Sequence, residues 1–167
     1  SKSVATTTTP KTTPTTTPSS TSISVATTAS LPVPIECVQA QNLTEEMRCT
    51  HRGTSLQDGT EIRDTETMMK AGYPWFRFTG STGNRLEDKC VPDYSCGSDG
   101  GIWSDEANIK SPVGVSKQVN AYTSWSSRCQ NKVLKIDVMR CSNKANDFIY
   151  CYASQFDWCN YAFCGKF

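Results

Sequence analysis

The sequence predicts a mainly β fold, a small disulfide-rich antiparallel module behind a disordered N-terminal tail; an α+β fold with short helices is the alternative. Three observations predict it. Residues 1–34 consist mostly of Thr, Ser and Pro, and all nine cysteines follow them. Several later segments alternate apolar with polar residues, a pattern typical of strands that bury one face.

The first segment, residues 1–34, has too little apolar surface to offset the entropy that ordering would cost. Its prolines favour extended backbone. Thr/Ser tracts with proline are typical of O-glycosylated, mucin-like stalks, and a bare flexible linker is the alternative. The threonines expected to carry sugars are Thr6, Thr7, Thr8, Thr9, Thr12, Thr13, Thr15, Thr16 and Thr17.

The next segment, residues 35–72, is the cysteine-bearing N-terminal part of the module. Asn42 or Thr44 can cap a short helix through Met47. The triplet that begins at Asn42 is the one complete N-glycosylation sequon. Two helical turns over 64–71 would end at Gly72.

Residues 73–167 form the cysteine-rich domain proper. Trp75–Thr79 alternates and predicts a strand with Phe76 and Phe78 on one face. Turn residues follow, so a return strand over Arg85–Val91 would make a hairpin. The Gly- and Ser-rich stretch Cys96–Pro112 predicts a long loop.

Two further strands are predicted near the C-terminus. In Val133–Met139 the apolar residues Leu134, Ile136 and Val138 face one way, and Phe148–Tyr152 is rich in aromatic and β-branched residues. Both patterns favour antiparallel strands that are closed by disulfides.

The composition indicates where the protein is located and excludes some classes of partner. Nine cysteines indicate a secreted, extracellular protein, because cytosolic thiols stay reduced. A net charge of +1 without a Lys/Arg cluster argues against nucleic-acid binding. No apolar run reaches the roughly 18–20 residues of a membrane span. The chain begins at Ser1 without Met, which indicates a processed chain or a fragment.

The stretch Trp75-Phe76-Arg77-Phe78-Thr79-Gly80 followed by Cys90-Val91-Pro92 and Cys96 resembles the signature of one extracellular module. That family is the eight-to-ten-cysteine module of uromodulin and of the pancreatic secretory granule glycoprotein. Weaker matches continue in order to Cys164, so the resemblance covers about residues 73–167. It implies a disulfide-bonded extracellular domain.

The resemblance also implies disulfide pairs: Cys90 with Cys129, Cys96 with Cys164, and Cys49 with Cys141. Tyr122 and Gln130 stand where the family has two further cysteines that are thought to bond to each other. Spacing alone leaves the connectivity open. The resemblance assigns no disulfide partner to Cys37, Cys151 or Cys159. Because nine is odd, one thiol can form an intermolecular disulfide, pair with a cysteine outside this sequence, or stay buried.

The sequence gives little support for catalysis or metal binding. His51 is the only histidine, and neither a paired zinc-ligand motif nor a serine-hydrolase motif accompanies it. The acidic residues in or just before the Gly-rich stretch, Asp93, Asp99, Asp105 and Glu106, lack calcium-loop spacing, so solvated loops explain them better. We therefore expect no catalytic residues, no metal and no cofactor.

Two aromatic residues are the candidates for binding. Phe156 and Trp158 lie just before Cys159 and would either fill a small core or anchor a partner. Trp75, Trp103 and Trp125 are better explained as core residues.

These observations favour a secreted, non-enzymatic glycoprotein of an extracellular matrix or mucus layer, with a structural or adhesive role that includes the organic matrix of a mineralised skeleton. Its expected partners are matrix proteins or glycans. A glycan- or protein-binding recognition module is the alternative, and an enzyme is the remote one.

Overall fold

The computed structural model describes residues 32–49, 61–64, 68, 71–72, 74–108, 110–153 and 160–167. The chain divides into two units, Ser1–Leu31 and Pro32–Phe167. The predicted stalk falls almost entirely outside the described residues and stays a prediction.

The described elements are mostly strands, joined by one short α-helix and two 3₁₀ turns, which confirms the mainly β class. In chain order they are α1 (Ile35–Gln39), β1 (Gln41–Leu43), η1 (Glu46–Arg48), β2 (Phe76–Phe78), η2 (Gly80–Thr82), β3 (Arg85–Leu86), β4 (Gly100–Trp103), β5 (Ser116–Trp125), β6 (Arg128–Arg140), β7 (Phe148–Tyr152), β8 (Tyr161–Phe163) and β9 (Gly165–Lys166).

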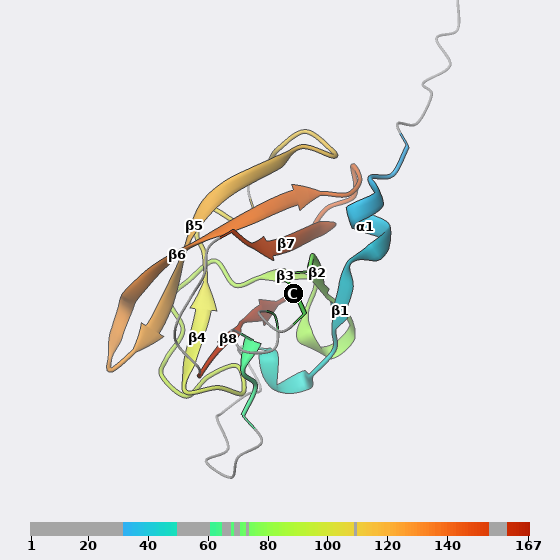
Figure 1. Cartoon of the computed structure of the whole chain (residues 1–167). Coiled ribbons are helices and arrows are strands. Elements are labelled where there is room, and N and C mark those ends of the chain that lie inside the picture. The colour runs from blue at the N-terminus through green and yellow to red at the C-terminus, as the bar shows by residue number, and fades with distance from the viewer. Residues whose placement is uncertain are drawn as a thin grey trace, which may run out of the picture. The chain divides into compact units, whose positions relative to one another are not determined.

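Seven of these strands form one sheet in the order β1-β2-β7-β6-β5-β4-β8, and β3 pairs with β9 in a small second sheet. The central strands β7, β6, β5 and β4 are antiparallel to one another in sheet order, as predicted. The outer pairs β1–β2 and β4–β8 are parallel. Figure 1 shows β5 and β6 as the longest ribbon of the sheet.

The sheet curls so that its two ends meet around an aromatic core. Phe76 of β2 and Phe163 of β8 are separated by four intervening strands in the sheet order, yet their ring centroids are 4.6 Å apart. Tyr150 of β7 is also fully buried, and its hydroxyl donates to Asn108. Such tilted aromatic contacts stabilise a core beyond the area that they bury.

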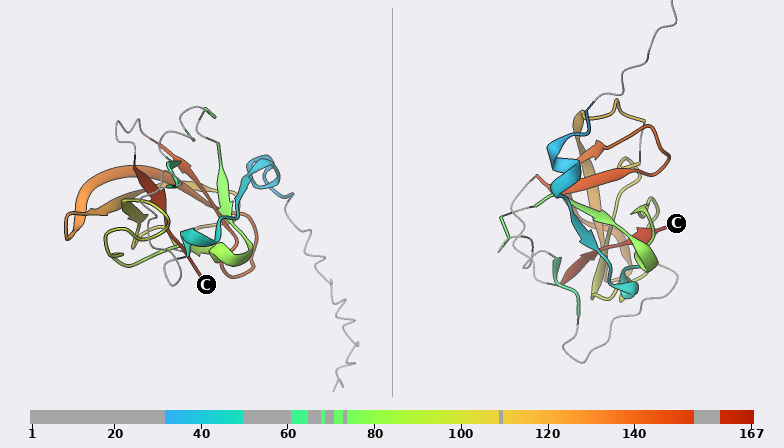
Figure 2. Two further views of the ribbon diagram at one scale, coloured as in Figure 1. Left: turned by 90° about the horizontal axis from the view of Figure 1, so that it is seen from below. Right: turned by 90° about the vertical axis from the view of Figure 1, so that its right-hand side faces the viewer.

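The inner faces of the long strands follow the predicted alternation. Leu134, Ile136 and Val138 of β6 are buried, and Val119 and Ala121 of β5 lie on the same side. Between the two strands, Ser126 and Ser127 form a two-residue turn with φ of 54° and 59°. Two positive φ values are what a type I′ hairpin turn requires. Figure 2 shows this end of the hairpin reaching beyond the rest of the sheet.

Helix α1 covers part of the other face of the sheet. Cys37 of α1 packs with Met139 of β6 and Ile149 of β7, and Trp75 lies partly buried beside them. The disulfide Cys37–Cys141 fixes this contact. A helix of five residues would be marginal by itself, so the crosslink and the apolar contacts hold it.

Three expected elements differ from the structure. The short helix through Met47 with Asn42 or Thr44 as its cap is wrong, because Asn42 lies in β1 and the turn η1 begins after Glu45 without a side-chain cap. The hairpin of β2 with the strand over Arg85–Val91 is wrong, because β2 pairs with β1 and β7 while β3 pairs with β9. The 3₁₀ turn η2, closed by the reciprocal side-chain and backbone bonds of Thr79 and Thr82, redirects the chain. The loop expected over Cys96–Pro112 contains strand β4.

No helix among the described residues has the length and apolar character that crossing a bilayer requires.

Candidate binding site at an exposed disulfide

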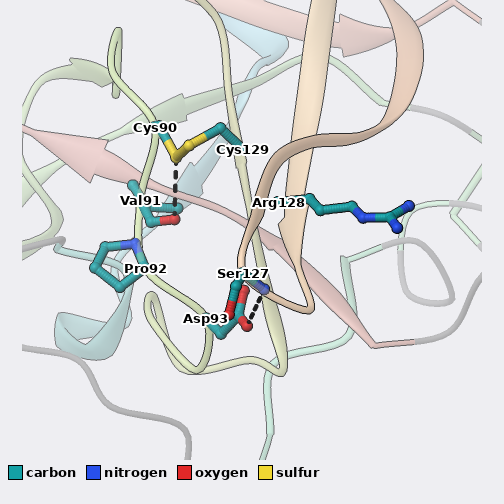
Figure 3. A pocket seen from close by; sticks show the side chains of 7 residues that line it. All are labelled: Cys90, Val91, Pro92, Asp93, Ser127, Arg128 and Cys129. Atoms are coloured by element: carbon teal, nitrogen blue, oxygen red, sulfur yellow. Dashed lines mark hydrogen bonds between the residues drawn. A yellow bond between two sulfur atoms is a disulfide. The ribbon is translucent and has the colours of Figure 1, made fainter.

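A small pocket lies at the tip of the β5–β6 hairpin, where the loop before β4 crosses it. Its volume is about 230 Å³. The residues that line it are Cys90, Val91, Pro92, Asp93, Ser127, Arg128 and Cys129. Figure 3 shows the disulfide at one end of the pocket, Asp93 and Ser127 at the other, and the side chain of Arg128 directed away from them.

Two hydrogen bonds and one disulfide tie the loop and strand β4 to the hairpin. The Asp93 carboxylate accepts a hydrogen bond from the backbone N–H of Ser127 at 2.8 Å. The indole N–H of Trp103 donates to the carbonyl of Cys129 at 3.0 Å. Since these contacts come from different elements, the pocket is held in shape before any ligand arrives, which lowers the entropic cost of binding.

Two aromatic residues are close in sequence to residues that line the pocket, Tyr94 directly after Asp93 and Trp125 two residues before Ser127. The Tyr94 and Trp125 rings meet edge to face with centroids 5.6 Å apart. Tyr94 is 42% exposed, and its φ of 58° lies in the left-handed region. A ring with one exposed face and a hydroxyl can stack on an apolar surface while it hydrogen-bonds to a polar group.

The three disulfides among the described residues differ in their surroundings. Cys90 and Cys129 are bonded to each other, and both are exposed. The disulfide Cys96–Cys164 is fully buried, beside Trp103 and Val91. These are two of the pairs that the resemblance implies. The third disulfide, Cys37–Cys141, is also buried.

The implied pairing of Cys49 with Cys141 is wrong. Helix α1 brings the Cα of Cys37 within 5.6 Å of the Cα of Cys141, close enough for a disulfide. Cys49 instead lies beside Gly165 in a short parallel bridge, is 1% exposed, and has no disulfide partner among the described residues. Cys159 lies outside the described residues, so its connectivity stays open.

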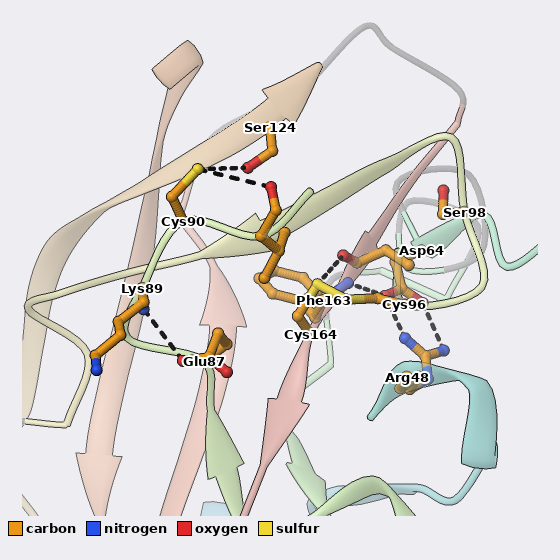
Figure 4. The surroundings of a disulfide bond; sticks show 12 residues. Arg48, Asp64, Glu87, Lys89, Cys90, Cys96, Ser98, Ser124, Phe163 and Cys164 are labelled. Atoms are coloured by element: carbon orange, nitrogen blue, oxygen red, sulfur yellow. Dashed lines mark hydrogen bonds and ion pairs between the residues drawn. A yellow bond between two sulfur atoms is a disulfide. The ribbon is translucent and has the colours of Figure 1, made fainter. Parts of the chain in front are cut away.

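A buried ion pair supports the Cys96–Cys164 disulfide. The Asp64 carboxylate accepts hydrogen bonds from both terminal nitrogens of Arg48, one of them at 2.7 Å. It also accepts from the backbone N–H of Phe163 at 2.7 Å. Figure 4 shows Arg48, Asp64 and Phe163 next to the disulfide. This network joins residues far apart in sequence, and no short motif in the sequence signals it.

Other predicted site residues are placed as follows. Phe156, Trp158 and His51 lie outside the described residues, so the binding role of the two aromatics stays a prediction. Asn42 is exposed on the edge strand β1. Trp103 is buried as expected.

Two of the acidic residues singled out above, Asp93 and Asp99, have individual hydrogen-bond partners. Asp93 accepts from Ser127, and Asp99 accepts from the side chain of Asn160 at 2.8 Å. Within the described residues, no group of three or more His, Cys, Asp or Glu side chains is arranged to hold a metal ion.

The exposed disulfide leads to a chemical prediction. Under limiting reductant we expect Cys90 and Cys129 to be released before the cysteines of the two buried disulfides, because thiol–disulfide exchange requires access of the attacking thiolate to sulfur. Alkylation followed by peptide mass mapping would measure the order. Labelling of Cys96 and Cys164 before Cys90 would contradict the prediction.

Comparison with known proteins gives consistent results. The profile of the uromodulin-like eight-cysteine domain matches residues 76–165. Uromodulin of Mus musculus is 27% identical over 128 residues, which are 77% of this chain and 18% of that protein. The pancreatic secretory granule membrane major glycoprotein GP2 of Canis lupus familiaris is 30% identical over 78 residues, 47% of this chain and 14% of that protein. Each match thus spans less than a fifth of the relative's length.

Proposed function

The chain belongs to the family of uromodulin-like eight-cysteine domains, and we propose that it is a secreted, non-enzymatic glycoprotein with a structural or adhesive role in an extracellular matrix or mucus layer. One observation carries the proposal. The module places two segments, fixed to each other by the Cys90–Cys129 disulfide, around a pocket that opens to solvent. Such a surface binds a partner without a change in shape and survives outside the cell.

Glycosylation would suit the same role. Sugars on the threonines of residues 1–34 would hydrate and stiffen that segment and hold the module away from its neighbours. The exposed position of Asn42 on an edge strand supports its use as an N-glycosylation site. A sugar there would also cover the outer edge of β1 and discourage pairing with other strands. The organic matrix of a mineralised skeleton is one setting for such a molecule.

A second candidate function is recognition of a glycan or protein at the pocket itself. The Tyr94–Trp125 pair favours it, because an exposed aromatic ring beside polar side chains can stack on a sugar ring. Asp93 and Ser127 would supply the neighbouring polar groups. In this case one local site, rather than the whole surface, would carry the affinity.

One binding experiment tests both candidates. We expect the unreduced protein to bind to extracellular matrix or mucus prepared from its native source, and the reduced, alkylated protein to lose binding because the surface is no longer fixed. A Tyr94→Ala variant that loses about tenfold in affinity would favour recognition at the pocket, whereas unchanged binding would favour the adhesive role. Native protein that binds none of these materials would contradict both.

A further inference from the structure

A second pocket, of about 380 Å³, lies at the turn between β6 and β7. Its volume is within the range of about 300–1,000 Å³ that is usual for small-ligand sites. Three of its lining residues are cationic, Lys110, Arg140 and Lys144, and none is acidic. The whole chain has a net charge of +1, so this is a local concentration of positive charge.

The cationic groups have distinct roles. The guanidinium of Arg140 donates to the carbonyls of Ser111 and Ser142, at 3.0 and 3.2 Å, so its position is fixed. Lys110 and Lys144 are exposed, and no ion pair among the described residues involves either of them. Two ammonium groups are therefore free to pair with an anion beside a fixed guanidinium.

The wall of this pocket is an ordered turn. The backbone N–H of Cys141 donates to the carbonyl of Asp147 at 2.8 Å, and the Ser142 hydroxyl donates to the Asp147 carboxylate at 2.5 Å. The carboxylate also lies 3.7 Å from Arg77, outside the pocket lining. The Cys37–Cys141 disulfide anchors the start of the turn. Asp147, the acidic residue of this turn, is thus held by its own partners and lies outside the pocket lining.

Uncharged polar groups complete the pocket. Its lining contains three side-chain amides, Asn108, Asn143 and Asn146. Asn108 is fixed, because it donates to the carbonyl of Leu86 at 2.8 Å and accepts from the hydroxyl of Tyr150 at 3.0 Å. Amides donate and accept hydrogen bonds at once, as the hydroxyls of a sugar require. Phe148 supplies an apolar part of the wall.

We propose that this pocket binds an acidic saccharide, with Lys110, Lys144 and Arg140 around its sulfate or carboxylate and the asparagine amides on its hydroxyls. Extracellular polyanions are largely sulfated or carboxylated sugars, and a secreted protein meets them in matrix and mucus. The inference rests on the proposed structural or adhesive function and names the class of partner. It uses a different surface from the pocket beside Cys90–Cys129.

Binding of a heparin hexasaccharide to the full chain, measured by calorimetry at physiological salt, tests the proposal. We expect the double variant Lys110→Glu/Lys144→Glu to lose at least about tenfold in affinity, because like charges would then face the ligand. The matched control is Lys89→Glu/Lys135→Glu, with the same change in net charge at two exposed lysines outside the lining. We expect the control to change affinity by less than about threefold. If the charge-reversed variant does not fold, a Lys110→Ala/Lys144→Ala variant replaces it. Its circular dichroism spectrum should match that of wild type, and it should also lose affinity.

Desulfated hexasaccharide and inorganic sulfate show whether the sugar, the sulfate or both are needed for binding. We expect each of them to bind more weakly than the sulfated hexasaccharide. Equal loss in the two double variants, or inorganic sulfate that binds as tightly as the hexasaccharide, would overturn the proposal. If the Lys110/Lys144 variants still bind to native matrix as wild type does, the saccharide site is wrong while the adhesive function stands. If wild type does not bind to matrix, the proposed function fails.

Discussion

Replacement of Asp64 by Asn is expected to lower the free energy of unfolding by about 3–5 kcal/mol, because it leaves the buried guanidinium of Arg48 without its main counter-charge. The side chains of Arg48 and Asp64 are both only 3% exposed. Burial by itself would lower the pKa of Arg48, but the charge and hydrogen bonds of Asp64 outweigh it and the pKa lies above its usual value. Glu45, which also bonds to Arg48, is half exposed and compensates only in part.

Urea denaturation followed by tryptophan fluorescence would measure this effect. Asp88→Asn is the matched control, since Asp88 pairs with Lys166 in a more exposed site and its loss should cost about 1 kcal/mol or less. The expectation is wrong if Asp64→Asn and Asp88→Asn unfold at the same urea concentration.

The second large effect is expected for the fully buried disulfide. The Cys96–Cys164 disulfide closes a loop with a sequence separation of 68 residues. Replacing both cysteines with Ala raises the entropy of the unfolded chain, which lowers the free energy of unfolding by about 4 kcal/mol. It also leaves a cavity beside Trp103. Because a domain of this size is stable by only about 5–15 kcal/mol, we expect a large loss in thermal stability.

Cys90→Ala/Cys129→Ala provides the comparison. The sequence separation of 39 residues predicts a similar entropic loss of stability, about 4 kcal/mol. Both cysteines are exposed, however, so their replacement leaves no buried cavity. Trp103 and Asp93 still bond to the hairpin. Calorimetric melting should therefore place this variant above the Cys96/Cys164 variant. A reversed order would show that burial of the disulfide does not matter.

The strands that the sequence predicts are those whose own side chains define a face. In β6, Leu134, Ile136 and Val138 alternate with polar residues, and the strand forms as expected. Strand β5 could not be predicted in this way, because its fully buried apolar residues on the core are only Val119 and Ala121, with Trp125 partly buried, and its position depends on pairing with β6. Its turn, Ser126-Ser127, lacks the Asn-Gly signal of type I′ hairpins.

Strand β4 could not be predicted from the sequence for another reason. Its first residues, Gly100 and Gly101, are typical of loops, but here the chain needs them for close packing. A Cβ at Gly101 would lie 2.5 Å from the sulfur of Cys164, and one at Gly100 would lie 2.6 Å from the carbonyl oxygen of Ser124. Such contacts come from tertiary packing and leave no trace in local sequence.

The candidate sites, like the strands, could be predicted from the sequence only in part. The resemblance correctly implied the Cys90–Cys129 disulfide, which borders the first pocket. It gave the wrong partner for Cys141, because the position of α1 over the sheet decides between Cys37 and Cys49. The cationic pocket draws Lys110 and Lys144 together across more than thirty residues of sequence, so composition and spacing could not reveal it.

Disulfides hold this small module in one shape, and mass mapping of the unreduced protein from its native source tests this most directly. We expect peptides linked as Cys37–Cys141, Cys90–Cys129 and Cys96–Cys164. A protein whose cysteines all react with an alkylating reagent before any reductant is added would contradict it.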